Sequence, residues 1–360
     1  IGASSFDEVK LLIDFAKLNK VGLVVIQMDG LLADGLADKF TQHGFPTFGP
    51  SRLASQIEWS KIFANEVMIA ANIPTAHAHP FRNPEVAEAC AYVIEKDGQV
   101  VIKADSLALG KGAFVCHEVK EALEVTNKLM VEKTLGKAGE NVLIQDRLEG
   151  TELSIHALCD GDNIIMLPPL RDHKHLLDGN KGPMTGGMGV YGPIDVAPGL
   201  MDQIHDTIVL PCIQELRRRG TPFRGCLYPG IMLTKDGPKV LEFNARFGDP
   251  ETQVYMRLLA DDTDLVEVFL ACAEGRLSEV AVAWRGGKAI CIVAAADGYP
   301  DKPEKGKAIV IDDSIACAPH QVIFLAGAAF KNDELVTSGG RVLGVTSLVR
   351  DVVEVEDAYA

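Results

Sequence analysis

The segment VLEFNARFGDPE, residues 240–251, brings oxygen ligands and a cation into one short stretch. Glu242 and Asn244 lie two residues apart in an expected strand, so both side chains should point to one face of a sheet. A carboxylate and an amide oxygen suit Mg²⁺, which prefers hard oxygen ligands and retains phosphate oxygens and waters. Phe243 should face the core, and Asp249-Pro250-Glu251 should cap the next helix. The alternative is a solvent-facing strand edge, which the poor strand propensity of Asn disfavours.

A second stretch, VIKADSLALGKGAF at residues 101–114, has the composition of a phosphate-binding loop. Lys103 ends an expected strand, and Gly110, Lys111 and Gly112 follow in the loop. Glycines let the backbone approach an oxyanion closely, and lysine neutralises phosphate charge. The spacing excludes a Walker P-loop, because this loop opens a strand rather than a helix. Taken alone, Gly-Lys-Gly is equally compatible with an ordinary tight turn.

The segment at residues 171–193 is rich in glycine, proline and charge, and we expect it to form a long functional loop. Asp172, His173 and Lys174 are adjacent titratable groups. The glycines within residues 185–189 can present successive N–H donors to an anion. The alternative is a mobile polar surface loop without a ligand.

A fourth segment, IQDRLEGTELS at residues 144–154, could bind the edge of a purine through its backbone groups. Glu152 could accept hydrogen bonds from ribose hydroxyls. A simple β-hairpin explains this segment equally well when it is considered alone. The order of the four segments favours a nucleotide held between two sheets.

The elements that must position these residues alternate as in an α/β protein. Apolar residues recur at helical spacing near 6–16, 31–40 and 51–71, and residues 21–26 form a short apolar run of strand length. Further helices are expected at 84–96, 118–135, 198–219, 250–260 and 262–275, and strands at 100–104, 113–116, 141–147, 152–159, 163–167, 225–234 and 239–243. From Lys288 onward, short strands with glycine turns predict a small β-rich domain.

Composition excludes several classes of function. The 360 residues carry a formal net charge of −15, which argues against a broad basic face for nucleic acid. No apolar run reaches the length of a membrane span. The eight cysteines are scattered, without C-x-x-C pairs or zinc spacing, so we expect free thiols in a reducing compartment and a cytoplasmic location.

The order and wording of these motifs resemble the glycinamide ribonucleotide synthetases, the phosphoribosylamine–glycine ligase family of purine biosynthesis. Matching stretches include FGPS at 48–51, GKG at 110–112, DHK at 172–174, TGGMG at 185–189 and EFNARFGDPET at 242–252. The resemblance covers nearly the whole chain and is most specific at the last two stretches.

The resemblance implies an α/β protein with the ATP-grasp fold. The expected domains are a truncated N-terminal parallel α/β domain at 1–50, an ATP-grasp domain at 51–282 and a small β-rich C-terminal domain at 283–360. A small nucleotide-covering subdomain is expected at about 73–146. The family normally opens with a strand and a glycine-rich turn that help bind phosphoribosylamine, and this opening is absent here.

The resemblance also implies a reaction. ATP phosphorylates the carboxylate of glycine, and the amine of 5-phosphoribosylamine attacks the glycyl phosphate to give glycinamide ribonucleotide, ADP and phosphate. The implied cofactors are ATP and Mg²⁺, with Mn²⁺ as an alternative ion. The implied partners are these small-molecule substrates, without nucleic acid or membrane, and fusion to other purine-pathway enzymes is known in the family.

Carried over by position, the resemblance assigns a role to each candidate residue. Those at the nucleotide would be Lys61, Lys103, Gly110, Lys111, Gly112, Gln145, Asp146, Arg147, Leu148, Glu152, His175 and Met184. Those at the substrates would be Asp172, His173, Lys174, Thr185, Gly186, Gly187, Met188, Gly189, Arg246 and Arg341. The catalytic residues would be Lys174, Arg246 and Asp249, and the metal ligands Glu242 and Asn244.

Some positions depart from the family pattern. Met184 stands where Asn is expected and His175 where Arg is expected. Met cannot donate the hydrogen bonds of Asn, and neutral His is a weaker phosphate partner than Arg. Gln27-Met28-Asp29 replaces Gly-Pro-Glu. Two alternatives therefore stay open: another ATP-grasp carboxylate–amine ligase, or a catalytically impaired nucleotide-binding relative.

Overall fold

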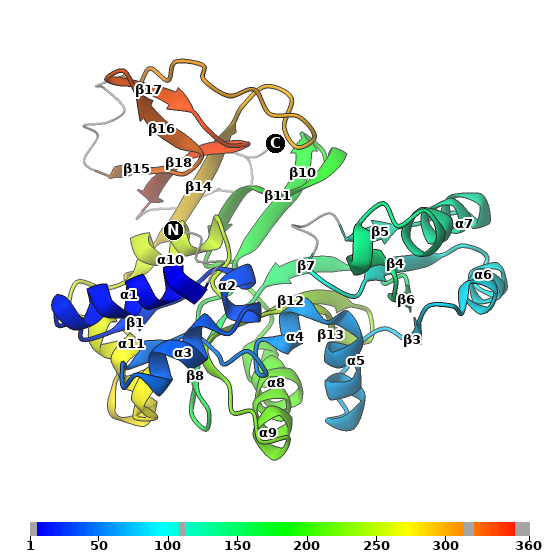
Figure 1. Ribbon diagram of the computed structural model, residues 1–360, viewed down its shortest axis with the longest axis horizontal. Coiled ribbons are helices and arrows are strands. Elements are labelled where there is room, and N and C mark those ends of the chain that lie inside the picture. The colour runs from blue at the N-terminus through cyan, green and yellow to red at the C-terminus, as the bar shows by residue number, and fades with distance from the viewer. Residues whose placement is uncertain (1–5, 108–111, 313–319, 350–360) are drawn as a thin grey trace. The chain divides into compact units, whose positions relative to one another are not determined.

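The computed structural model describes residues 6–107, 112–312 and 320–349, and the chain divides into two compact units. Each unit gathers segments that are far apart in the sequence (Figure 1). Unit 1 comprises the residues up to Leu167, Ala197–Phe247 and Asp264–Ala281. Unit 2 comprises Pro168–Val196, Gly248–Thr263 and the residues from Val282 onward.

Unit 1 begins with the expected alternation of helix, strand and helix. Strands β1 and β2 pair in parallel, and an apolar cluster that includes Ile13, Leu32 and Phe40 packs between them and the helices. The elements are α1 (Phe6–Leu18), β1 (Val24–Val25), α2 (Asp29–Ala33), α3 (Leu36–Gln42) and β2 (Thr47–Phe48).

A four-stranded antiparallel sheet in unit 1 carries Lys103 and Gln145. Its strand order is β3-β6-β4-β5, and helices α6 and α7 cover one face (Figure 1). Val93, Ile102 and Ile144 are fully buried between the sheet and these helices. The elements are β3 (Ala78–Phe81), α6 (Val86–Glu95), β4 (Val100–Ala104), β5 (Ala113–Val115), α7 (Val119–Thr126), a π-helical turn (Asn127–Val131), a 3₁₀ turn (Gly136–Gly139) and β6 (Val142–Asp146).

The second sheet of unit 1 carries the predicted metal ligands. Strand β12 is central and pairs with β13, β8 and β7. Strand β9 pairs with the other side of β8. The strands are β7 (Thr151–Ser154), β8 (Ala157–Asp160), β9 (Ile164–Met166), β12 (Arg224–Thr234) and β13 (Gly237–Asn244). Around them lie α4 (Gln56–Trp59), α5 (Lys61–Ala70), α8 (Leu200–Ile204), a π-helical turn (His205–Val209), α9 (Leu210–Arg218), α11 (Leu265–Glu274) and a 3₁₀ turn (Leu277–Glu279).

The single long helix expected at 51–71 is wrong, because the structure has two shorter helices there. The break lies at Ser60, whose backbone is extended with φ −120° and ψ 109°. Its hydroxyl accepts a hydrogen bond from Phe63 N at 3.1 Å, so Ser60 is the N-cap of α5. The break places Lys61 in the first turn of α5.

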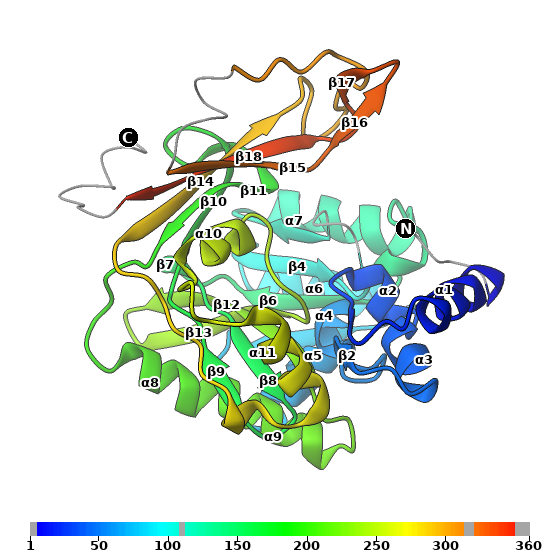
Figure 2. The ribbon, with the colours of Figure 1, turned by 90° about the vertical axis from the view of Figure 1, so that its left-hand side faces the viewer.

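Unit 2 is built on a five-stranded antiparallel sheet in the order β10-β11-β14-β18-β15, with helix α10 packed against it (Figure 2). A separate hairpin joins β16 and β17. The expected β-rich C-terminal region is therefore observed. The elements are β10 (Arg171–Leu177), β11 (Lys181–Gly192), α10 (Glu251–Leu258), β14 (Lys288–Ala295), β15 (Gln321–Leu325), β16 (Ala328–Lys331), β17 (Glu334–Thr337) and β18 (Arg341–Val349).

The long loop expected at 171–193 is also wrong, because this segment forms the hairpin of β10 and β11. Strand β11 pairs with β10 on one side and with β14 on the other, so the sheet satisfies the backbone groups that a loop would expose. Register shifts interrupt the β10–β11 pairing on either side of His175. The high glycine and proline content of the segment predicted a loop. Strand formation depends strongly on pairing with neighbouring strands, which composition does not show.

The capping role expected for Asp249 is not observed. Helix α10 begins at Glu251, and Pro250 before it makes no side-chain cap. The Asp249 Oδ1 atom instead accepts a hydrogen bond from Gln253 Nε2 at 2.7 Å. The carboxylate therefore lies beside the first turn rather than over its open N–H groups.

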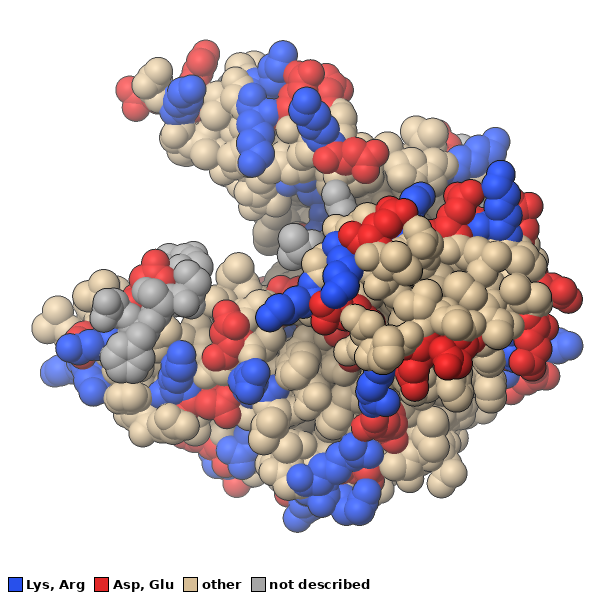
Figure 3. All heavy atoms as spheres, turned by 45° about the vertical axis from the view of Figure 1, so that its right-hand side comes forward, with Lys and Arg blue, Asp and Glu red and all other residues tan. Residues whose placement is uncertain are grey.

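Several expectations from composition agree with the described residues. All seven cysteines among them are free thiols, and six of these are buried. Acidic and basic side chains are interspersed over the face in Figure 3, without a continuous basic surface among the residues drawn in colour. In the part of the chain that the structure describes, no helix has both the length and the apolar character needed to cross a membrane.

Candidate nucleotide and metal site

The orientation of Glu242 and Asn244 depends on a β-bulge in β13. Gly230 pairs with Glu242, but Ile231 pairs with Val240, so Leu241 is an extra residue on β13. Val240 and Phe243 are both fully buried although they lie three residues apart. In a regular strand, two residues on the same face are separated by an even number of positions. The bulge thus shifts the alternation by one residue and turns Glu242 and Asn244 away from the core.

The two side chains fit a hard divalent cation. Both are partly exposed on one face of β13, as expected, with Phe243 on the opposite face. The Asn244 Nδ2 atom donates to Tyr228 O at 3.3 Å, which directs the amide oxygen away from that carbonyl. Within the described residues, no group of three or more His, Cys, Asp or Glu side chains could hold a metal ion. Such a two-residue site suits Mg²⁺, which completes its shell with phosphate oxygens and waters.

Two lysines converge on the same strand from different elements. The Lys61 Nζ atom lies 3.0 Å from Glu242 Oε2 and also donates to Glu58 O at 3.1 Å. The Lys103 side chain is buried, and its Nζ atom donates to Leu241 O, the bulged residue, at 2.6 Å. The structure therefore brings Lys61 and Lys103, which lie far apart in the sequence, to the strand that carries Glu242 and Asn244.

Asp105 anchors the start of the glycine-bearing loop, a role that we did not predict. Its Oδ1 atom accepts hydrogen bonds from Ser60 Oγ at 2.8 Å and from Ile62 N at 3.0 Å, so the loop begins beside α5. At the other end, Ala104 N donates to Gly112 O at 2.8 Å. The predicted Gly110 and Lys111 lie outside the described residues.

The predicted adenine segment follows strand β6. Gln145 is buried in the centre of the sheet, opposite Val101. The next two side chains are engaged in ion pairs: Asp146 with Lys96 Nζ at 2.9 Å and Arg147 with Glu149 at 3.3 Å. Only backbone groups at Gln145–Leu148 were expected to meet adenine, and these ion pairs leave that prediction open. The predicted ribose ligand Glu152 lies on β7, opposite Met232 on β12.

A buried carboxylate, Glu58, lies behind the metal strand. Its Oε1 atom is 3.2 Å from Arg246 Nε, and its Oε2 atom accepts a hydrogen bond from Ala245 N at 2.9 Å. Burial raises the pKa of Glu58, and the Arg246 charge opposes that rise. We did not predict Glu58, since its partners lie almost 190 positions further along the chain.

In unit 2, the hairpin of β10 and β11 brings the Asp172–His175 segment against the glycine-rich stretch. His173 lies opposite Gly189, and burial lowers the pKa of the His173 ring. A Cβ atom on Gly187 would lie 2.9 Å from Asp172 Oδ1, so those two residues are in close contact.

The predicted anion donors of the hairpin are engaged internally. Thr185 Oγ1 donates to Lys174 O at 2.8 Å and accepts from Gly187 N at 3.1 Å. Gly186 N donates to the Tyr299 hydroxyl at 3.2 Å. Neighbouring groups within unit 2 therefore hold this stretch in place.

Arg341 ties the same stretch to Asp249. Its Nη1 atom donates to Gly186 O at 2.8 Å, and its Nη2 atom lies 3.0 Å from Asp249 Oδ2. Arg341 had been expected at the substrate. The contacts show that it also orders two other predicted residues.

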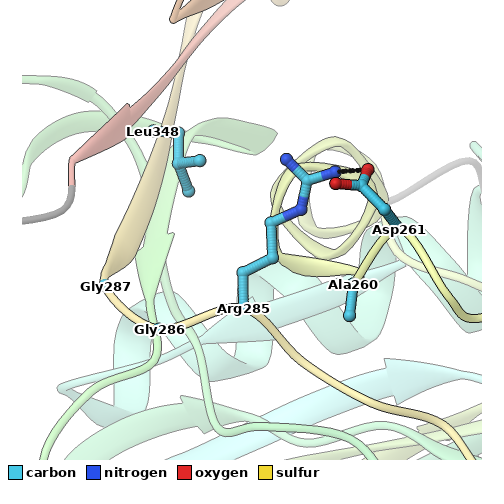
Figure 4. A pocket seen from close by; sticks show the side chains of 6 residues that line it. All are labelled: Ala260, Asp261, Arg285, Gly286, Gly287 and Leu348. Carbon is cyan, nitrogen blue, oxygen red and sulfur yellow. Dashed lines mark hydrogen bonds and ion pairs between the residues drawn. The ribbon is translucent and has the colours of Figure 1, made fainter.

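Two pockets, one in each unit, lie away from these residues. In unit 2, Arg285 and Asp261 form an ion pair at the wall of a pocket of about 560 Å³ (Figure 4). Arg285 Nε also donates to Leu259 O at 2.8 Å, so this arginine fastens the chain after α10. A pocket of about 710 Å³ in unit 1 is lined partly by residues 37–53. None of the predicted site residues lines either pocket.

Comparison with known proteins identifies the family. Models of the phosphoribosylglycinamide synthetase N domain, ATP-grasp (A) domain and C domain match residues 2–58, 59–252 and 289–360. The chain belongs to the phosphoribosylglycinamide synthetase family. It is 43% identical to the phosphoribosylamine–glycine ligase of Rhodopirellula baltica, over 93% of this chain and 78% of that protein. It is 39% identical to that of Caldanaerobacter subterraneus, over 96% of this chain and 81% of that protein.

Solved structures agree with the synthetase family and confirm the ATP-grasp fold. The phosphoribosylamine–glycine ligase of Thermotoga maritima matches with a TM-score of 0.76 and 36% identity, over 84% of this chain and 74% of that one. The biotin carboxylase domain of Hydrogenobacter thermophilus 2-oxoglutarate carboxylase matches with a TM-score of 0.73 at 17% identity, over 97% and 76% of the two chains. At that identity the second match shows the fold alone.

Family membership also bears on cofactors and partners. ATP-grasp enzymes of this kind use ATP with divalent metal ions. Fusion to other purine enzymes occurs among synthetase relatives, as expected. This chain is 43% identical to part of a bifunctional purine biosynthetic protein of Saccharomyces cerevisiae and 41% identical to part of the human trifunctional protein, covering 43% and 35% of their lengths.

Proposed function

We propose that this chain ligates glycine to 5-phosphoribosylamine at the expense of ATP, giving glycinamide ribonucleotide, ADP and phosphate. One observation carries the proposal: the bulge in β13 directs Glu242 and Asn244 to the face where Lys61 contacts Glu242. This arrangement occurs in a chain whose family includes proteins named for that reaction. The seven described cysteines form no disulfide, which supports a cytoplasmic location.

The chemistry requires charge neutralisation and positioning more than covalent catalysis. A carboxylate is a poor electrophile, and its phosphorylation by ATP to glycyl phosphate supplies a leaving group for attack by the amine. Lys61 and Lys103 would neutralise the phosphates and hold them in line with the glycine carboxylate. A divalent cation, Mg²⁺ or Mn²⁺, held by Glu242 and Asn244 would reduce the phosphate charge during transfer.

The remaining roles follow the family pattern. Adenine would be held by the backbone of Gln145–Leu148 and ribose by Glu152, with Gly110–Gly112 over the phosphates. His175 and Met184 would lie near the same phosphates. The substrate side would comprise Asp172, His173, Lys174, Thr185, Gly186, Gly187, Met188, Gly189, Arg246 and Arg341, with Lys174, Arg246 and Asp249 next to the reacting groups.

A second candidate function is nucleotide binding without turnover. It is favoured by one observation in unit 2, where His175 and Met184 face each other in the register of β10 and β11. The two departures from the family pattern are therefore direct neighbours in one small region of the hairpin. A chain that binds Mg–ATP but releases no ADP would have this function.

The test is ADP release from Mg–ATP in the presence of glycine and phosphoribosylamine. We expect the unaltered chain to release ADP only when both substrates are present. E242Q should weaken Mg–ATP affinity by at least about tenfold, measured by calorimetry, and should abolish turnover, because it removes the anionic metal ligand. E334Q, at the exposed first residue of β17, is the matched control and should match the unaltered chain. Turnover that survives in E242Q would show the metal assignment to be wrong.

A further inference from the structure

We propose that Glu58 is a positioning residue that holds the Arg246 guanidinium and the end of the metal strand in one orientation. The inference rests on the proposed function, in which Arg246 lies next to the reacting groups. Glu58 itself lies on α4, behind β13, and is only 5% exposed. It therefore acts through Arg246 and through the backbone that follows Asn244.

Both carboxylate oxygens of Glu58 contact this segment. Oε1 lies 3.2 Å from Arg246 Nε, and Oε2 accepts from Ala245 N at 2.9 Å. The Arg246 Nη1 atom also donates to Phe247 O at 2.9 Å. Because a guanidinium is planar and rigid, contacts at Nε and Nη1 fix the plane of the whole group.

The backbone on the other side of Arg246 is held independently. Phe247 N donates to Gln27 Oε1 at 2.8 Å, and the Gln27 Nε2 atom donates to Ile26 O at 2.8 Å. The amides on both sides of Arg246 are thus bound by side chains from distant parts of unit 1. The Arg246 side chain therefore leaves the backbone from a fixed point.

Charge and burial favour a positioning role over a purely stabilising one. Burying an ion pair stabilises a fold little, because the desolvation cost offsets the attraction, but it can fix a unique geometry. Glu215 on α9 provides the comparison: its side chain is also 6% exposed, but it is covered by its partners Arg218 and Arg219 near the surface rather than by the interior. None of the predicted site residues contacts Glu215 through these bonds, so its ion pairs hold the end of α9 and, through Arg219, its contact with α5.

The kinetic test compares E58Q with E215Q. We expect E58Q to lower kcat about 10- to 100-fold while the KM for ATP changes less than about threefold, because only the orientation of Arg246 is lost. E215Q should lower Tm but leave kcat unchanged. In an R246Q background, adding E58Q should slow turnover less than about twofold further. Effects that multiply in the double variant would overturn the inference, since Glu58 would then act independently of Arg246.

A spectroscopic test separates this inference from the proposed function. With arginine labelled by ¹⁵N, the Arg246 Nε–H should exchange slowly with solvent in the unaltered chain and in E215Q, but at least about tenfold faster in E58Q. Unchanged exchange in E58Q would overturn the positioning role whatever the activity. Absence of ADP release from the unaltered chain would overturn the proposed function, while the exchange measurement would still decide the role of Glu58.

Discussion

At the scale of single residues, His156 shows how the interior supports the site. Its ring is fully buried and stacks on Tyr228 with centroids 3.9 Å apart. Tyr228 in turn accepts the amide hydrogen bond of Asn244 through its backbone carbonyl. Burial lowers the pKa of His156 well below its ordinary value, and the Arg246 charge acts in the same direction. The folded chain therefore keeps this ring neutral.

This depressed pKa predicts a loss of stability on acidification. Below the ordinary histidine pKa of about 6.5, His156 binds a proton in the unfolded chain but not in the folded chain. The free energy of unfolding therefore falls as pH falls. Between pH 7.5 and pH 5.5 the contribution should be on the order of 1 kcal/mol. H156F should lose correspondingly less stability than the unaltered chain over this interval, measured by urea unfolding. H43F, at an exposed histidine, is the control. An equal loss in H156F and the unaltered chain would contradict the prediction.

At the scale of elements, Gly187 allows the β10–β11 hairpin to approach α10 closely. Gly187 has φ +115°, in the region that favours glycine, and an added Cβ atom would lie 2.8 Å from Pro250 Cδ. Pro250 precedes α10, so the glycine allows the strand to pack closely against the start of that helix. A side chain here would push the two apart.

G187A should therefore destabilise the chain by about 1–3 kcal/mol, through backbone strain and overlap together. The control is G199A, because Gly199 also has positive φ, +79°, but nothing lies within 4 Å of an added Cβ atom. Urea unfolding of both variants gives the comparison. If G187A is no less stable than G199A, the close approach to Pro250 is not a constraint.

Elements differed in how well the sequence predicted them. The β12–β13 hairpin was predicted from its Asp236-Gly237 turn, because a short-range signal fixed both the turn and the strands. The β10–β11 hairpin was missed, since its strands are set by pairing with β14 rather than by their own residues. The pair of Glu58 and Arg246 left no local signal, because only folding brings such distant positions together. The bulge was missed because one extra residue leaves composition unchanged.

At the scale of the whole molecule, the predicted residues are divided between the two units. Unit 1 holds Lys61, Lys103, Glu152 and the predicted metal ligands. Unit 2 holds the β10–β11 hairpin, Asp249 and Arg341. The family match extends over both units. The predicted roles of His175 and Met184 require the β10–β11 hairpin itself to respond to nucleotide.

Hydrogen exchange with Mg–ADP tests this requirement. We expect slower exchange in β4, β6 and β13 of unit 1 and also in β10 and β11 of unit 2, because bound ligands suppress local opening. The β16–β17 hairpin carries none of the predicted residues and serves as the internal control. Protection confined to unit 1 would show that the roles given to His175 and Met184 are wrong.

The extra residue in β13 has a consequence for anyone who redesigns or aligns this protein. Regular pairing with β12 that included Leu241, without the bulge, would bury Glu242 and Asn244 in the interior and expose Phe243 to water. Chemically mild substitutions along β13 should thus do less harm than a slip of its register against β12 by one residue. In a sequence alignment, a gap placed one column away from its true position in β13 would assign cation binding to side chains that belong to the core.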